Sequence, residues 1–163
     1  MKLDAKDAKI LNLVQLNNRL SKSEIGDEIG LTHSGVSRRL QRLHDRSVIF
    51  ADVALVAPEA VGYPVRMNVS CSIERDRLDT YDRFVAALQA DPMVVNADAV
   101  MGKSDFTFTV IARDMDAYLN LIERYRGAFP TLSSVTGLAV LRSVKRGLKI
   151  PVEPTSVFRP ANR

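Results

Sequence analysis

The order of two kinds of hydrophobic periodicity constrains the fold of this chain more than any other feature. Apolar and polar residues alternate over 67–73 and 106–111, as they do in half-buried strands. Apolar residues recur every three or four positions over 78–88 and 115–125, as they do in amphipathic helices. In chain order the expected elements are a strand at 67–73, a helix at 78–88, strands at 94–100 and 106–111, a helix at 115–125 and a strand at 135–144. This βαββαβ order predicts a split βαβ, ferredoxin-like sandwich over residues 63–150.

A sandwich of this kind leaves one face of its sheet uncovered. Two helices cover only one side of a four-stranded sheet, so the other side is expected to meet a second copy of the chain in a face-to-face dimer. Cys71 is the single cysteine. It is expected to be a small buried core residue rather than a reactive thiol, and a lone cysteine excludes an internal disulfide framework.

The first fifty residues carry the start and stop signals of three short helices. Asp4 and Thr32 are good N-caps, and Ser21 with Glu24 forms a capping box. Gly30 is suited to end the second helix in a left-handed conformation. A helix, a tight turn and a second helix predict a helix-turn-helix unit.

The third expected helix has one apolar stripe and an opposite face of hydrogen-bonding and basic side chains. Such a face suits the major groove of DNA, where Arg38 is expected to read a base while Arg39 and Arg42 contact phosphates. The alternative is an ordinary three-helix bundle with a charged exterior. The candidate DNA contacts are Lys22, Thr32, His33, Ser34, Ser37, Arg38, Arg39, Gln41 and Arg42.

Charge is distributed unevenly along the chain. Residues 1–50 carry nine basic and six acidic side chains, residues 51–141 eight and twelve, and residues 142–163 six and one, so the net charges are +3, −4 and +5. Basic ends around an acidic middle favour a polyanionic partner, although chance clustering on a solvated surface is the alternative. Residues 51–62 are expected to form a linker, with 48–53 as a short wing or linker strand. Residues 151–163 are expected to form a loosely held tail or, alternatively, a phosphate-binding arm.

Several classes of protein are not expected. No apolar run approaches the ~18 residues that span a bilayer, and the charged start lacks the apolar core of a signal peptide, so a cytoplasmic protein is expected. Both histidines, His33 and His44, lie in the first fifty residues. We find no Ser/His/Asp arrangement, phosphate-cradling glycine loop or metal-ligand cluster, so neither catalysis nor a metal or cofactor is expected.

Several segments together resemble the Lrp/AsnC, or feast/famine, family of transcription regulators over residues 3–152. In the first fifty residues they are 3–11, 19–25, 30–32 and 36–43, and in the sandwich they are Gly102 with Asp105 and the run 114–118. The resemblance implies an α+β protein with an N-terminal winged-type helix-turn-helix domain and a ferredoxin-like domain. It also implies double-stranded DNA as a partner and a homodimer, often assembled further into a tetramer or octamer.

The resemblance further implies a small effector, usually an amino acid, bound between subunits near the hairpin turn. The positions concerned are Gly102, Lys103, Ser104, Asp105, Thr136 and Gly137. Free backbone N–H groups of a turn can bind a carboxylate, and Asp105 can hold an ammonium group. Two departures from the family pattern stand out: Lys103 and Ser104 replace an acid and an aromatic residue, and Thr136-Gly137 replaces part of a Thr-x-Thr pattern. The ligand is therefore one with an extra negative charge, or the site is unused.

Two other functions remain as alternatives at this point. One is a small-molecule sensor with weak or non-specific DNA binding. The other is an enzyme, because some proteins with this two-domain plan resemble haem-precursor decarboxylases. The absence of detectable DNA binding at low salt would favour the sensor, and an absorbing cofactor or turnover by the purified protein would indicate the enzyme.

Overall fold

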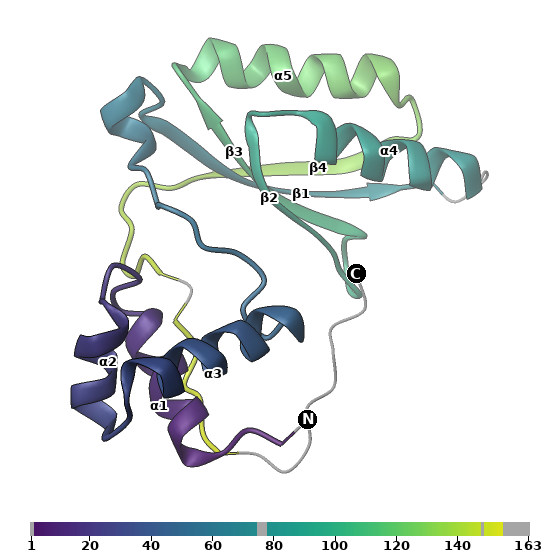
Figure 1. Cartoon of the computed structure of the whole chain (residues 1–163). Helices are drawn as coiled ribbons and strands as arrows, with labels where there is room; N and C mark the ends of the chain where they lie inside the picture. Colours follow the sequence, from purple (N-terminus) through teal and green to yellow (C-terminus); the bar gives the residue numbers. More distant parts are fainter. Residues whose placement is uncertain (1, 75–77, 148, 155–163) are drawn as a thin grey trace. The chain divides into compact units, whose positions relative to one another are not determined.

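A computed structural model describes residues 2–74, 78–147 and 149–154 of the chain. The chain divides into two compact units (Figure 1). The helical unit comprises the residues up to Ala54 together with those from Lys145 onward, and the sandwich unit comprises Leu55–Val144. Residues 145–150 were expected to belong to the sandwich, whereas the structure groups them with the helical unit.

The helical unit contains α1 (Ala5–Val14), α2 (Lys22–Ile29) and α3 (His33–Asp45). Its helix ends follow the sequence signals closely. Asp4, Ser21 and Thr32 each accept a hydrogen bond from a backbone N–H in the first turn, and Gly30 ends α2 with φ of 66°. Aliphatic side chains from all three helices form the core: Leu3, Ile10, Leu11, Ile25, Ile29, Val36 and Leu43.

Two backbone features shape the connections of these helices. A Cβ at Gly26 would collide with the carbonyl oxygen of Leu31, so only glycine lets the turn pack this closely against α2. After α3, Val48 N donates to Leu43 O and Ser47 N donates to His44 O, which is a Schellman motif. This motif places Ser47 at φ of 54°, a left-handed conformation that normally favours glycine.

The amide side chains of Asn12 on α1 and of Gln15, the C-cap residue of α1, hold the returning C-terminal segment. Asn12 Nδ2 donates to Val152 O at 2.8 Å, and Val152 N donates back to Asn12 Oδ1 at 3.3 Å. Gln15 pairs in the same way with Ile150, at 3.2 and 2.9 Å. We call these four residues the C-terminal clamp. Val152 is half-buried against the helical core, contrary to the expectation of a loosely held tail from residue 151; residues 155–163 lie outside the described residues.

The segment 48–53 does not form the expected wing or linker strand. Val48 and Ile49 instead pack against the core of the helical unit, whereas Phe50 and Val53 are exposed. The apolar side chains of Val48 and Ile49 are thus half-buried without strand pairing.

The sandwich unit confirms the βαββαβ order. After a short 3₁₀ turn (Pro58–Val61) it contains β1 (Val65–Ile73), α4 (Leu78–Ala90), β2 (Val94–Ala99), β3 (Phe106–Ala112), α5 (Met115–Ala128) and β4 (Leu132–Ala139). The sheet order is β2-β3-β1-β4, all antiparallel. The fourth strand was expected at 135–144. It begins earlier, through a bulge at which Ser134 has φ of 49°, and it ends at Ala139.

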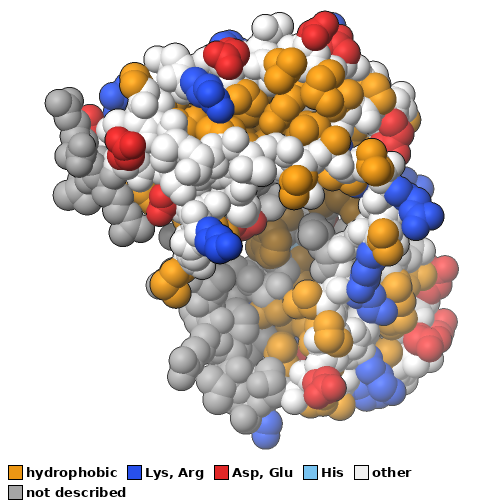
Figure 2. All heavy atoms as spheres, turned by 180° about the vertical axis from the view of Figure 1, so that it is seen from behind, with side chains coloured by type: hydrophobic (Ala, Val, Ile, Leu, Met, Phe, Trp, Pro, Cys, Tyr) orange, Lys and Arg blue, Asp and Glu red, His pale blue; other side chains and the backbone are white. Residues whose placement is uncertain are grey.

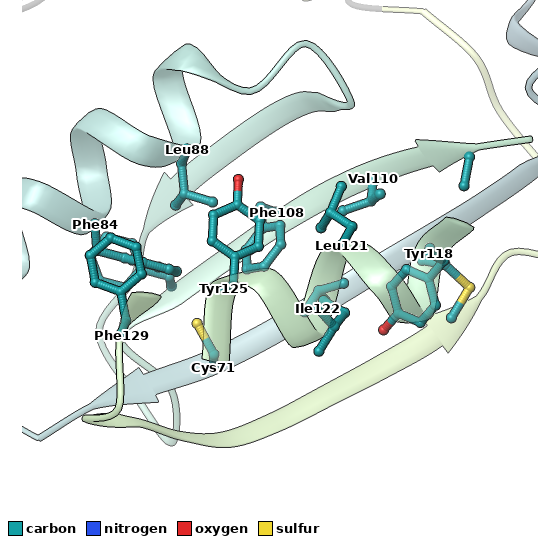
Figure 3. Packing of buried hydrophobic residues seen from close by; sticks show 14 of the residues in the cluster. Cys71, Phe84, Leu88, Phe108, Val110, Tyr118, Leu121, Ile122, Tyr125 and Phe129 are labelled. Atoms are coloured by element: carbon teal, nitrogen blue, oxygen red, sulfur yellow. The ribbon is translucent and has the colours of Figure 1, made fainter. Parts of the chain in front are cut away.

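Helices α4 and α5 cover one face of this sheet and enclose an aromatic core (Figure 3). Phe84 lies at its centre, with its ring edge-on to those of Phe106 at 5.1 Å, Tyr125 at 5.8 Å and Phe129 at 5.1 Å. Cys71 lies in the same core with no exposed surface, as expected. Burial, and then the negative charge of Asp105, raises the pKa of the Cys71 thiol to about 12, so the thiol stays protonated.

The other face of the sheet carries mainly hydroxyl and amide side chains. A shallow hollow of about 340 Å³ on this face is lined by residues that include Asn68, Ser70, Asn96, Thr107 and Thr109. Thr109 Oγ1 donates to Asn68 Oδ1 at 3.2 Å across β1 and β3. A partner on this face would therefore meet hydroxyl and amide side chains together with the exposed side chain of Leu138.

Candidate nucleic-acid interface and ligand site

One side of α3 presents short polar and basic side chains to solvent. His33, Ser34, Arg38 and Gln41 are exposed. Thr32 Oγ1 accepts a hydrogen bond from Gly35 N at 3.2 Å. This bond holds the backbone of the first turn of α3, in which His33 and Ser34 lie. The capping observed here and the exposure of this face agree with the sequence analysis.

Two hydrogen bonds orient side chains on this face. Lys22 Nζ on α2 donates to Ser37 Oγ on α3 at 3.1 Å, which links the two helices of the helix-turn-helix. Gln41 Nε2 donates to Asp45 Oδ1 at 2.8 Å, one turn further along α3. Arg38 and Arg42 are both exposed residues of α3, and Arg38 lies between Ser34 and Gln41 along the chain.

Arg39 and Arg42, which the sequence places among the DNA contacts, are already paired within the fold. Arg39 Nη1 lies 2.7 Å from Asp4 Oδ2 and 2.8 Å from Asp7 Oδ1. Arg42 Nη2 lies 2.7 Å from both carboxylate oxygens of Asp7. Burial tends to raise the pKa of Asp4, but the hydrogen bond from Arg39 and the backbone N–H of Asp7 outweigh it, so that pKa lies below its ordinary value.

The residues of the candidate effector turn follow β2. Gly102 and Lys103 are exposed, and Ser104 and Asp105 are half-buried. Asp105 fastens the turn to the end of β1, because its Oδ2 accepts from Ile73 N at 3.0 Å and its backbone N–H donates to Cys71 O at 3.0 Å. The carboxylate that the sequence analysis assigns to an ammonium group thus also supports the hairpin.

Thr136 and Gly137 point to opposite faces of β4. Thr136 pairs with Ser70 and lies on the polar face, whereas Gly137 pairs with Val69 and faces the helices. A Cβ at Gly137 would collide with the hydroxyl of Tyr118 on α5, so glycine is needed here to admit the tyrosine. The Thr136 side chain and the Cβ position of Gly137 thus lie on opposite faces of the sheet, and the assignment of both residues to the effector site stays a prediction.

A groove of about 490 Å³ lies between α4 and α5, and it was not predicted from the sequence. Its lining is mainly apolar. Figure 2, which shows the molecule from behind, shows hydrophobic side chains gathered on one part of the surface. At its polar end, Tyr125 Oη donates to Asp91 Oδ2 at 3.2 Å, and Arg124 Nη2 lies 3.7 Å from the same oxygen. Burial, together with the nearby Asp91 carboxylate, raises the pKa of Tyr125. The groove exists because the small side chains of Ala87, Ala90 and Ala128 do not fill the space between the two helices. These alanines were the feature of the sequence that could have indicated a groove.

Within 2–74, 78–147 and 149–154, no group of three or more His, Cys, Asp or Glu side chains could hold a metal ion. No helix in the same ranges has the length and hydropathy needed to cross a membrane.

Comparison with known proteins identifies both units. An AsnC-type helix-turn-helix domain matches residues 3–44, and an Lrp/AsnC ligand binding domain matches residues 68–150. The chain belongs to the Lrp/AsnC family of transcriptional regulators. An HTH-type transcriptional regulator, y4tD of Sinorhizobium fredii, is 39% identical over 153 residues, covering 94% of this chain and 90% of its own.

Solved Lrp/AsnC structures agree with this assignment. The structure of a transcriptional regulator from Neisseria meningitidis in complex with L-Met has a TM-score of 0.86 at 27% identity, covering 91% of this chain and 96% of its own. An AsnC family regulator from Agrobacterium tumefaciens has a TM-score of 0.85 at 25% identity, covering 91% and 97%. The expected fold class and family are thereby confirmed. These relatives are transcriptional regulators, so the comparison favours regulation over the decarboxylase alternative.

Proposed function

We propose that this Lrp/AsnC regulator binds a pseudo-palindromic DNA site as a homodimer and that a small amino-acid-like effector changes this binding. The observation that carries the proposal is the solvent-facing side of α3, with its first turn capped by Thr32. A dimer would place two such helices about one DNA turn (~34 Å) apart, or a multiple of it. On this proposal the protein acts in the cytoplasm by binding rather than by catalysis.

Base recognition falls to the residues at the centre of the exposed face. Arg38 can donate two hydrogen bonds to guanine, and Ser34, Ser37 and Gln41 can bond to base edges at close approach. His33 and Thr32 lie at the end of α3 that would enter the groove, and Lys22 is near enough to reach a phosphate.

The polar face of the sheet supports the dimer. Asn68, Thr107 and Thr109 have hydrogen-bonding capacity that a second sheet, with trapped water, can satisfy. We propose that two copies meet here, and that these dimers assemble further into tetramers or octamers as the resemblance implies.

The effector would bind at the turn formed by Gly102, Lys103 and Ser104. The L-Met complex of the Neisseria meningitidis relative supports an amino acid as the ligand class. Exposed Lys103 favours a ligand with a second negative charge, since its ammonium group can pair with a side-chain carboxylate. Thr136 lies on the polar face of β4 and belongs to the proposed site through its hydroxyl.

Binding to genomic fragments at fixed salt, with and without a panel of amino acids, tests this function. Discrete pseudo-palindromic sites, with an affinity that shifts for one amino acid, are the expected result. Uniform binding to all fragments, steeply dependent on salt, would contradict sequence-specific regulation. Loss of the effector response in Lys103→Ala, with DNA binding retained, would assign the effector to the turn.

Arg38→Gln gives the sharpest test of base recognition. Replacing a bidentate contact to guanine is expected to weaken binding to the best site by ~1–3 kcal/mol and to relax selection at one base position. Selection from a randomised DNA library measures this effect. An equal loss on every sequence would show that Arg38 contacts phosphate instead.

A further inference from the structure

Asp7 of α1 is the only charged or polar side chain fully buried among the described residues, with no exposed surface. Its carboxylate is nevertheless well supplied with hydrogen-bond donors. Oδ1 accepts from Arg39 and Arg42, and Oδ2 accepts from Arg42 and from Asp4 N at 3.2 Å. A buried charge is tolerated when it is paired and hydrogen-bonded in this way.

The two arginines come from the flank of α3 that turns toward α1. With Asp4 and Asp7 they form a group of two positive and two negative charges, which we call the Asp7 cluster. The group is neutral as a whole. Arg38 lies on the exposed side of the same helix, outside the cluster.

The side chains of Arg39 and Arg42 remain 21% and 45% exposed, but a cation that is paired with carboxylates of its own protein contributes little to binding DNA. Non-specific affinity grows with each phosphate that a protein cation neutralises, because each such contact releases counterions. Two uncommitted arginines beside the recognition face would therefore strengthen binding to every sequence and dilute the discrimination that Arg38 provides.

We propose that Asp7 is a specificity-determining residue of this regulator: it holds Arg39 and Arg42 against α1 and so limits non-specific contact with the DNA backbone. This proposal rests on the proposed DNA-binding face of α3. Asp7 acts through the two arginines and does not itself touch DNA. Its role differs from that of an ordinary core residue, since removing its charge should raise non-specific DNA affinity.

The test is Asp7→Asn in the full-length protein, a change that keeps the size of the side chain and removes its charge. Fluorescence anisotropy measures the dissociation constant on a random-sequence duplex and on the selected site over a series of salt concentrations. The slope of log affinity against log salt is expected to steepen by about one to two on the random duplex. The ratio of specific to non-specific affinity is expected to fall.

The matched control is Asp27→Asn, which removes the same charge from an exposed position of α2. It should leave the salt slope close to that of the wild type. An equal steepening in both variants would show a general effect of net charge and would overturn the proposal. An unchanged slope in a folded Asp7→Asn variant would also overturn it, since Asp7 would then be structural alone.

A second variant keeps the proposal testable if Asp7→Asn fails to fold. Arg42→Gln leaves the pairing of Arg39 with Asp4 and Asp7 in place. Its slope should equal that of the wild type, whereas Arg38→Gln should lower the slope by about one. A lower slope for Arg42→Gln would show that Arg42 contacts phosphate and would overturn the proposal. Failure of all variants and of the wild type to bind DNA would instead contradict the proposed function.

Discussion

The helical unit and the sandwich unit obtain their structure from different kinds of interaction. Three short helices with an aliphatic core are joined by caps, by the Asp7 cluster and by the C-terminal clamp. The sandwich is centred on the ring of Phe84, with other aromatic rings packed around it. In the unit proposed to bind DNA, ion pairs and side-chain hydrogen bonds therefore add to an aliphatic core, while aromatic rings form the centre of the core of the other. The difference suggests that small changes of charge alter recognition without disturbing the sheet.

The largest effect is expected at the centre of the sandwich core. Phe84→Ala should destabilise the sandwich unit by ~3–5 kcal/mol, because it removes a fully buried ring and leaves a cavity. Chemical denaturation followed by tyrosine fluorescence measures this change. Tyr81→Ala is the comparison: its ring also contacts Phe106 but is 39% exposed, and its loss should cost clearly less. Equal losses would contradict a core organised around Phe84.

A smaller effect is expected where β4 passes α5. Gly137→Ala should destabilise the sandwich by ~1–3 kcal/mol, because the added methyl group collides with the Tyr118 hydroxyl. The double variant Gly137→Ala with Tyr118→Phe, which lacks that hydroxyl, should recover part of the loss in thermal melts. Additive losses in the double variant would show that the hydroxyl is not the obstacle.

The smallest effect belongs to the helical unit and has the opposite sign. Ser47→Gly should stabilise it by about 1 kcal/mol, since a left-handed conformation is unfavourable for residues with a Cβ. Thermal unfolding monitored by circular dichroism at 222 nm measures the gain. Ser23→Gly in the first turn of α2, where the backbone is right-handed, should instead be destabilising. A loss of stability in Ser47→Gly would show that interactions of the serine side chain outweigh the backbone strain.

Local patterns predicted most of the elements of this fold. Asp4, Ser21 and Thr32 cap helices as expected because capping depends on residues three positions apart. The positions of β1 and β3 followed from alternation along single segments, and Cys71 was expected to be buried as a small apolar residue. The end of β4 was predicted less well, because Leu141 and Val144 are apolar residues that the structure leaves exposed.

Features that join distant segments could not be read from the sequence. Asp7 and its arginine partners are more than thirty positions apart, so the arginines looked like free surface cations. The orientation of Gly137 depends on a bulge that shifts the register between β1 and β4. For the candidate ligand site, the sequence indicated the hairpin turn. It did not indicate that the Asp105 carboxylate accepts a hydrogen bond from Ile73 N.

The C-terminal clamp has a consequence for how the protein is made. Asn12 and Gln15 leave the ribosome early, but Ile150 and Val152 follow only after the whole sandwich unit has been synthesised. The unit translated first is therefore the last to be completed. A nascent chain stalled within the sandwich would carry three helices that lack the four hydrogen bonds of the C-terminal clamp.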